Sequence, residues 1–274
     1  MLEDILDEKM VLTINECMAE TKYKNQYSKH FYRMRNDSIL MATANKYPPV
    51  DRNAFKCDLI GFREVHSLSK TLSQKIKDSG YVPDIIIAIG RGGYVPARLV
   101  CDFLLFDDLT TIKIEHYKRA ADIQETAKLK FPLSVDIHGK KIFVVDDVTD
   151  TGKTLSLAVE YLERLKPAEI KTAVLQHKTC SDFVPDYYAE KIIKWRWIIY
   201  PWAAYEDLTG FTENIIADKT LTPKQICNEF DACYSITIKR SDLTEILKDL
   251  NERGRIECID DKRNILWRKA NVSK

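Results

Sequence analysis

Two adjacent carboxylates and a short polar loop occur in residues 142–155, which read Ile-Phe-Val-Val-Asp-Asp-Val-Thr-Asp-Thr-Gly-Lys-Thr-Leu. The apolar run predicts a buried strand bounded by Asp146 and Asp147. Residues 151–154 then lead into a predicted amphipathic helix from Leu155 to Leu165. Unpaired backbone N–H groups and the positive end of the helix dipole favour a phosphate at such a helix start. A phosphate cradle beside two carboxylates that can bind hydroxyls or a metal ion suits a phosphorylated sugar.

A second loop of similar design lies upstream, in residues 84–96, which read Asp-Ile-Ile-Ile-Ala-Ile-Gly-Arg-Gly-Gly-Tyr-Val-Pro. Here a predicted buried strand ends in a glycine-rich turn, and a helix follows through Ala97 and Phe103. Glycines allow a backbone to come close to a ligand, and Arg91 adds a fixed positive charge. Two such loops, each at the end of a strand, indicate a ligand site more strongly than either loop alone.

Two alternatives apply to the acidic loop. A P-loop nucleotide site would need Gly-x-x-x-x-Gly-Lys-Ser/Thr, but only residues 152–154 match that pattern, and Asp147 stands where the first glycine should be. The other alternative is a chance strand–turn–helix with acids at the turn.

The acidic loop resembles the 5-phosphoribosyl-1-pyrophosphate (PRPP) motif of the type I phosphoribosyltransferases. That motif consists of an apolar strand, two acids, two or three residues and then Thr-Gly-x-Thr, and residues 142–154 contain every part of it. The same family has the upstream glycine-rich loop, which binds pyrophosphate there and in many members contains a non-proline cis peptide.

The resemblance implies a role for each loop residue. Asp146 and Asp147 would hold the ribose hydroxyls, directly or through Mg²⁺, which would also clamp the pyrophosphate. The catalytic general acid/base for the purine N7 would be Asp150. The 5-phosphate would lie against Asp150, Thr151, Gly152, Lys153 and Thr154. The leaving pyrophosphate would be bound by Arg91, Gly92 and Gly93.

Residues 173–178 and 195–202 resemble the purine site of the xanthine-guanine and hypoxanthine phosphoribosyltransferases. The resemblance implies that Lys178 donates to the purine 6-oxo group, that Trp197 stacks on the ring and that the backbone of Ile198 bonds the base edge. An ammonium group facing an exocyclic oxygen favours a 6-oxopurine over adenine, whose amino group is itself a donor. Without the two loops, these tryptophans would be interpreted as ordinary core aromatics.

This chain departs from the family pattern at one position of the base site. Related bacterial enzymes have an acid directly after Pro-Trp, whereas this chain has Ala203, with Glu206 and Asp207 slightly later. The sequence therefore does not separate hypoxanthine, guanine and xanthine. An orotate- or uracil-type transferase fits less well because of Lys178 and the Trp-Ile pair.

The chain divides into three predicted parts: a helical N-terminal extension (1–56), a phosphoribosyltransferase domain (57–212) and a small α+β, winged-helix-like C-terminal domain (213–274). The central part alternates strands and helices, which predicts an α/β fold with a largely parallel sheet flanked by helices and ligands at the strands' carboxyl ends. By the resemblance, the polar residues 117–137 form a hood that closes over the reaction and excludes water; the alternative is a surface hairpin. Thr222 is a candidate N-cap for the first C-terminal helix.

The composition predicts a soluble cytoplasmic protein. A net charge of +1 gives no overall field for nucleic acid or membrane, and no apolar run reaches the length of a membrane span. The first residues do not resemble a signal peptide. Seven cysteines without a Cys-x-x-Cys pair indicate reduced thiols, and no zinc pattern is present.

We therefore expect an enzyme, a Mg²⁺-dependent phosphoribosyltransferase that transfers phosphoribosyl from PRPP to a 6-oxopurine in purine salvage, and that forms a homodimer as family members commonly do. The alternative is a PRPP-sensing transcription regulator that binds DNA through its C-terminal winged helix. Asp150 and Lys178 favour the enzyme because a sensor needs neither. Interleaved acids in the basic C-terminal part make DNA the less favoured partner there, after a structural or protein-contact role.

Overall fold

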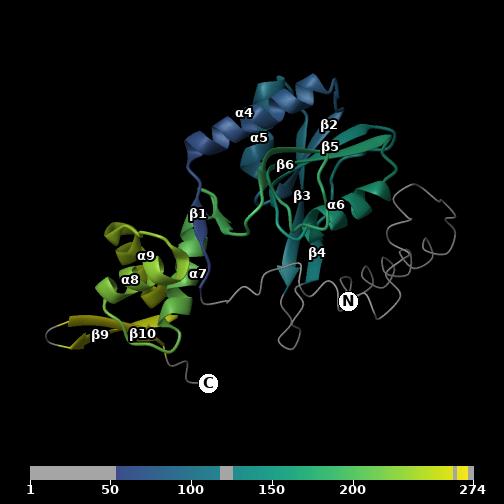
Figure 1. Ribbon diagram of the computed structural model, residues 1–274. Coiled ribbons are helices and arrows are strands. Elements are labelled where there is room, and N and C mark those ends of the chain that lie inside the picture. Colours follow the sequence, from purple (N-terminus) through teal and green to yellow (C-terminus); the bar gives the residue numbers. More distant parts are fainter. Residues whose placement is uncertain (1–53, 118–125, 262–263, 271–274) are drawn as a thin grey trace, which may run out of the picture. The chain divides into compact units, whose positions relative to one another are not determined.

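The computed structural model describes residues 54–117, 126–261 and 264–270 (Figure 1). The predicted N-terminal extension over residues 1–56 lies almost wholly outside the described residues, and so does the tip of the predicted hood, residues 118–125. Within the described part, no helix is both long enough and apolar enough to cross a membrane.

A six-stranded sheet forms the centre of the fold, and its strands run in the order β4-β3-β2-β5-β6-β7. Neighbouring strands are parallel except for β3 and β4, which pair antiparallel on either side of the hood tip. The strands are β2 (Ile85–Gly90), β3 (Leu109–Tyr117), β4 (Thr126–Phe131), β5 (Lys141–Thr149), β6 (Glu169–Lys178) and β7 (Tyr187–Ile192). The prediction of a largely parallel sheet is confirmed.

Helices cover both faces of this sheet (Figure 1). On one face lie α4 (Phe62–Asp78) and α5 (Tyr94–Leu104), and on the other lies α6 (Lys153–Glu163). The central strands alternate between the two cores: in β5, Phe143 and Val145 pack with α4 and α5, whereas Ile142 and Val144 pack with α6. Burial on both faces explains why these strands read as unbroken apolar runs.

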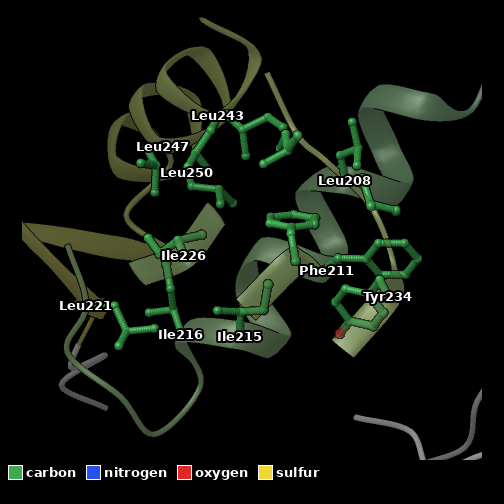
Figure 2. Packing of buried hydrophobic residues seen from close by; sticks show 14 of the residues in the cluster. Leu208, Phe211, Ile215, Ile216, Leu221, Ile226, Tyr234, Leu243, Leu247 and Leu250 are labelled. Carbon is green, nitrogen blue, oxygen red and sulfur yellow. The ribbon is translucent and has the colours of Figure 1, made fainter. Parts of the chain in front are cut away.

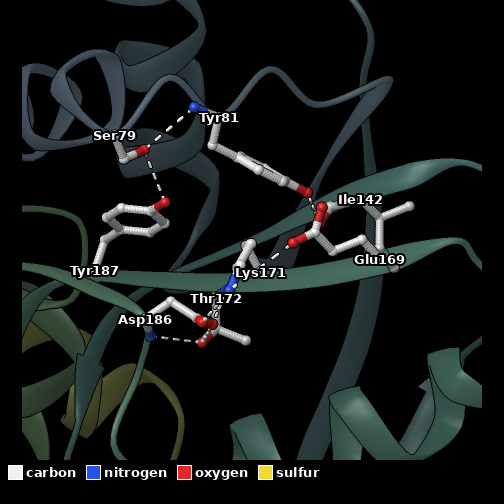
Figure 3. Close-up of polar contacts among 8 residues, drawn as sticks. All are labelled: Ser79, Tyr81, Ile142, Glu169, Lys171, Thr172, Asp186 and Tyr187. Atoms are coloured by element: carbon white, nitrogen blue, oxygen red, sulfur yellow. Dashed lines mark hydrogen bonds and ion pairs between the residues drawn. The ribbon is translucent and has the colours of Figure 1, made fainter.

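Polar contacts tie together the amino ends of the strands (Figure 3). The Tyr81 hydroxyl donates to the Ile142 carbonyl at 2.9 Å. Asp186, just before β7, accepts from the Thr172 backbone N–H at 2.8 Å and forms an ion pair with Lys171 at 3.0 Å. These contacts fix the edge of the sheet opposite the ligand loops.

A separate two-stranded parallel sheet pairs β1 (Cys57–Leu59) with β8 (Trp197–Ile199). Strand β8, which contains the predicted base-site residues Trp197 and Ile198, therefore lies outside the main sheet. Its residues alternate between two hydrophobic cores: Ile198 packs with the core of α4 and α5, and Ile199 with the core of the C-terminal helices.

The described C-terminal part contains three helices and a hairpin (Figure 1). These are α7 (Ala204–Ile216), α8 (Pro223–Tyr234), α9 (Arg240–Glu252), β9 (Ile256–Asp261) and β10 (Asn264–Lys269). Thr222 caps α8 as predicted, since its hydroxyl accepts from the Gln225 N–H in a reciprocal capping box.

Apolar side chains from all three helices meet in one core, which we call the C-terminal core (Figure 2). Phe211 of α7 stacks on Tyr234 of α8 with ring centroids 4.3 Å apart, and Leu243 and Leu247 of α9 close the other side. Helix α7 was not predicted as an element, yet it supplies this core with Leu208, Phe211, Ile215 and Ile216.

Candidate active site

A cavity of about 1030 Å³ lies where the loops after β2 and β5, the end of β6 and the start of α7 meet. The predicted site residues that line it are Arg91, Gly92, Asp146, Asp147, Asp150, Thr151, Gly152, Thr154, Lys178, Trp197 and Ile198. This is the carboxyl edge of the parallel strands, where open α/β sheets bind ligands. Predicted residues that are not among those lining the cavity are Gly93 and Lys153.

Asp146 and Asp147 lie at the carboxyl end of β5, which runs to Thr149 rather than ending before the acids. Burial, together with the neighbouring Asp147 charge, raises the pKa of the Asp146 carboxyl well above its usual range. Burial also raises the pKa of Asp147 to about 6, against a lowering contribution from the hydrogen bond of the Trp202 indole, 3.2 Å from Oδ2. A bound cation would offset the charge repulsion of such a pair.

The Tyr200 side chain contacts the strand end that carries Asp146 and Asp147. Its hydroxyl donates to the Asp147 carbonyl at 3.2 Å and to Gln176 Oε1 at 2.8 Å, and its ring stacks on Trp202 at 4.8 Å. Burial raises the pKa of Tyr200 well above its usual value, so the phenol stays a donor at neutral pH. Trp202 and Tyr200 thus fix the strand end that carries the carboxylates.

The glycine-rich loop after β2 lies directly against the acid pair. A side chain at Gly92 would overlap the Asp147 carboxylate, and one at Gly93 would overlap the backbone of β5 at Val145. The peptide bond between Gly90 and Arg91 is cis, as the family resemblance implied for this loop. Gly93 therefore acts in packing the loop onto the sheet, which explains its absence from the cavity wall.

The loop after β5 begins helix α6. Gly152 has φ of +83°, a conformation that side chains disfavour, and a Cβ there would also meet Phe183 and Ser181. The helix starts at Lys153, whose backbone N–H donates to the Thr151 hydroxyl at 3.4 Å, so the first-turn N–H groups face this loop. Thr151, Gly152 and Thr154 place this donor-rich turn on the cavity.

Asp150 and Lys178 form an ion pair across the cavity wall, with Nζ 3.0 Å from Oδ2. The Lys178 side chain is 3% exposed and that of Asp150 34% exposed. Trp195 completes the group, since its indole donates to Asp150 Oδ1 at 2.9 Å and its ring lies 4.8 Å from the ammonium. The loop after β5 and the end of β6 are therefore joined by a charged contact against Trp195, two residues before β8.

Helix α7 contributes two carboxylates to the cavity. Glu206 forms an ion pair with Arg91 at 2.6 Å, in which both side chains are exposed. Burial raises the pKa of Asp207 to about 6, against a lowering contribution from the Trp197 side chain and with smaller raising contributions from Glu206 and Asp147. Glu206 and Asp207 are the two acids that the sequence places shortly after Ala203, where related bacterial enzymes have an acid.

The sequence profile of the phosphoribosyl transferase domain matches residues 62–207, more than half of the chain. The chain belongs to the phosphoribosyltransferase family. The family and the enzyme class predicted from the two loops are therefore confirmed.

Relatives of this phosphoribosyltransferase include the hypoxanthine-guanine phosphoribosyltransferase of Saccharomyces cerevisiae, 28% identical over 52% of this chain and 84% of that protein. The xanthine-guanine phosphoribosyltransferase of Nitratidesulfovibrio vulgaris is 29% identical over 59% of this chain and 90% of that protein. Among solved structures, a purine phosphoribosyltransferase from Pyrococcus horikoshii shares 33% identity and covers 54% of this chain and 93% of that chain, with a TM-score of 0.48.

Several cavity residues of this phosphoribosyltransferase were missed in the sequence. Lys113 and Glu115 of β3 line the cavity and pair at 2.6 Å, but in the sequence they read as ordinary alternation in a strand. Tyr94 and Trp202 also line it. Only Trp202 had a signal, since it belongs to the Pro-Trp pair next to the predicted base site.

Proposed function

We propose that this chain is a Mg²⁺-dependent purine phosphoribosyltransferase that transfers phosphoribosyl from PRPP to a 6-oxopurine, giving the nucleoside monophosphate and pyrophosphate in purine salvage. The observation that carries the proposal is the 3.0 Å pair of Asp150 and Lys178 inside the cavity that also holds the acid pair and the phosphate turn. On a 6-oxopurine, N7 and O6 are neighbouring acceptors on one edge. A lysine and an acid held in contact can serve these two atoms together.

The PRPP half of the site follows from the two loops. The turn at 151–154 would bind the 5-phosphate through its backbone N–H groups, and Arg91 with the Gly92 backbone would bind pyrophosphate. Asp146 and Asp147 would hold the ribose hydroxyls.

The acid pair also fits a magnesium ion. Among the described residues there is no cluster of three or more His, Cys, Asp or Glu side chains suited to a metal. Mg²⁺ usually keeps several waters and uses only one or two carboxylates with substrate phosphates. Asp146 and Asp147 would therefore hold it together with pyrophosphate, where it would neutralise charge on the leaving group.

The chemistry would be a displacement at the ribose C1 carbon with oxocarbenium character. The negative charges of Asp146 and Asp147 would favour a cationic sugar in the transition state. Asp150 would take or return the N7 proton while Lys178 donates to O6. Trp197 would stack on the base, and the Ile198 backbone would bond its edge.

The remaining parts of the proposal are a cytoplasmic homodimer and the division at residues 56 and 212 into an extension, a transferase domain and a C-terminal domain. The boundary at 212 falls within α7, whose Leu208 and Phe211 already belong to the C-terminal core. DNA is not favoured as a partner of the C-terminal domain. Its helix α9 carries more acids than bases, namely Asp242, Glu245, Asp249 and Glu252 against Arg240 and Lys248.

The test is a steady-state assay of the purified chain with PRPP and Mg²⁺ against hypoxanthine, guanine, xanthine, adenine, orotate and uracil separately. We expect turnover with at least one 6-oxopurine and none with orotate or uracil. Replacing both Asp146 and Asp147 with Asn should weaken PRPP binding and the dependence on Mg²⁺. No turnover with any base, together with tight PRPP binding, would instead favour the alternative function, a PRPP-sensing transcription regulator.

A further inference from the structure

Both oxygens of the Asp150 carboxylate have a side-chain donor in the structure. Lys178 Nζ lies 3.0 Å from Oδ2, and the Trp195 indole donates to Oδ1 at 2.9 Å. The terminal torsion of an aspartate is broad, so a carboxylate with a single partner can turn easily. Because the two donors act on different oxygens, turning the Asp150 carboxylate out of its plane lengthens both contacts. Lys178 and Trp195 therefore fix the plane of this carboxylate together.

Trp195 acts on the carboxylate from outside the cavity. It precedes β8 by two residues and is not among the side chains that line the cavity. The Lys178 ammonium lies 4.8 Å from the centroid of its ring, so the indole contacts both members of the ion pair. An indole N–H is a donor only, so Trp195 can orient Asp150 but cannot take a proton from it.

The Trp195 ring packs against Phe55, which lies on the neighbouring extended segment. Strand β1 pairs in parallel with β8 in a register that places Cys57 beside Trp197, so Phe55 and Trp195 occupy equivalent positions two residues earlier. Their ring centroids are 5.9 Å apart with an interplanar angle of 75°. This is the edge-to-face arrangement that aromatic pairs favour, so Phe55 restricts the orientation of the indole.

The other contacts of Phe55 are with the C-terminal core. Its ring centroid lies 5.6 Å from that of Phe211 and 5.1 Å from that of Tyr234, and its backbone N–H donates to the Cys233 carbonyl at 2.7 Å. Phe211 and Tyr234 stack on each other within the C-terminal core (Figure 2). A continuous series of contacts therefore runs from this core through Phe55 and Trp195 to the ion pair of the cavity.

Most of this series lies outside residues 62–207, the range that the family profile matches. Phe55 precedes that range, and Phe211 and Tyr234 follow it. Side chains from both flanking parts of the chain thus stand behind a residue of the proposed reaction.

We propose that Trp195 is a positioning residue for Asp150, and that Phe55 couples Trp195 to the C-terminal core, so that the C-terminal helices support the reaction. The inference rests on the proposed function, in which Asp150 takes or returns the N7 proton. A carboxylate held at a fixed angle to Lys178 reaches N7 in the orientation that proton transfer needs while the ammonium donates to O6.

Trp195→Phe removes the N–H donor and keeps an aromatic ring beside Phe55. We expect kcat to fall about 3- to 10-fold, the equivalent of one hydrogen bond. The KM values for PRPP and for the base should change by less than about twofold, because Trp195 does not line the cavity. In an Asp150→Ala background, which has no carboxylate to orient, Trp195→Phe should add nothing.

Phe55→Leu removes the ring between Trp195 and the C-terminal core. We expect kcat to fall about 2- to 5-fold, the equivalent of one aromatic pair, with both KM values retained. The matched control is Leu247→Val, which shortens a buried side chain on the other side of the same core (Figure 2) and should leave kcat unchanged. Urea unfolding of both variants separates a general loss of stability from the loss of this contact.

The indole N–H resonance of Trp195 gives a readout that needs no reaction. It is recorded in proton–nitrogen NMR spectra of the unliganded protein and assigned by its loss in Trp195→Phe. A hydrogen bond to a carboxylate moves an indole proton downfield. The resonance should therefore move upfield in Asp150→Ala, shift in Phe55→Leu and stay in place in Leu247→Val.

An unchanged kcat in Trp195→Phe, or a loss of the same size in the Asp150→Ala background, would overturn the positioning role. Equal losses of kcat in Phe55→Leu and Leu247→Val would overturn the part assigned to the C-terminal core. An indole resonance that is unmoved in Asp150→Ala would refute the contact itself. If the unaltered protein turns over no base, the proposed function is refuted instead, and the role of Trp195 in catalysis falls with it.

Discussion

Removing the Asp150 carboxylate separates its two functions, proton transfer and pairing with Lys178. Asp150→Ala deletes both the acceptor of the Trp195 indole and the partner of the ammonium. Asp150→Asn keeps an oxygen for the indole but cannot exchange a proton at neutral pH. Comparing the two variants therefore isolates the acid/base role from the structural one.

The magnitudes follow from the geometry. A positioned general acid/base contributes about 10²- to 10⁴-fold to the rate, so kcat should fall by that factor in both variants. Breaking a fully buried ion pair costs about 3–5 kcal/mol. Because the Asp150 side chain is 34% exposed, we expect a smaller loss of stability in Asp150→Ala, about 1–3 kcal/mol.

The assay combines steady-state turnover with PRPP binding measured by isothermal titration calorimetry. PRPP affinity should change little, because the phosphate turn binds through backbone groups that neither substitution removes. Urea unfolding should show the stability loss in Asp150→Ala and a smaller one in Asp150→Asn. An Asp150→Asn variant whose kcat stays within threefold of the unaltered protein would refute the acid/base assignment.

Three further outcomes are expected. Gly92→Ala should raise the KM for PRPP at least tenfold, because the new methyl group overlaps the Asp147 carboxylate and must displace it. Glu206→Gln should tighten pyrophosphate inhibition by about two- to fivefold, since it frees Arg91 from an exposed ion pair worth up to about 1 kcal/mol. The carboxyl of Asp207 has a folded pKa of about 6, above the unfolded value, so its protonation stabilises the fold at low pH and this stabilisation is lost as pH rises through 6. Asp207→Asn should therefore gain about 1–2 kcal/mol relative to the unaltered protein between pH 4 and pH 7.5, a figure discounted for partial exposure and measured by urea unfolding at both pH values.

Each of these outcomes has its own control or counter-result. Gly61→Ala places a methyl group in open space and should leave PRPP kinetics unchanged. Pyrophosphate inhibition that is unaltered in Glu206→Gln would place Arg91 outside the pyrophosphate site. A stability difference for Asp207→Asn that is flat with pH would show that this carboxyl titrates near its ordinary value.

The central fold could be predicted because its signals are local. Strands buried on both faces give apolar runs, and the helix from Phe62 to Asp78, α4, shows one apolar face. The two ligand loops could be predicted because glycines and paired acids at strand ends are rare without a ligand. The strands β1, β4 and β7 were missed: β1 has only three residues, and β4 and β7 are edge strands that contain charged side chains.

What the sequence could not show is which distant side chains meet. That Asp150 pairs with Lys178 depends on the β5–β6 register, in which Thr149 lies beside His177. That Glu206 and Asp207 reach the cavity wall depends on α7, a helix that was not predicted. Its apolar residues pack against elements far along the chain, and its first turn contains the acids that were noted only for following Pro-Trp.

Because the residues of β8 pack alternately in two hydrophobic cores, this strand affects how the chain unfolds on heating. Ile198 belongs to the core of the transferase sheet, and its neighbour Ile199 belongs to the C-terminal core, so two consecutive residues of one strand are divided between two hydrophobic clusters. Neither cluster can come apart without exposing this strand. Calorimetry of the protein should thus record these two clusters unfolding in one cooperative transition rather than two, and a purine bound against β8 should protect the remote α8 and α9 amides from hydrogen exchange.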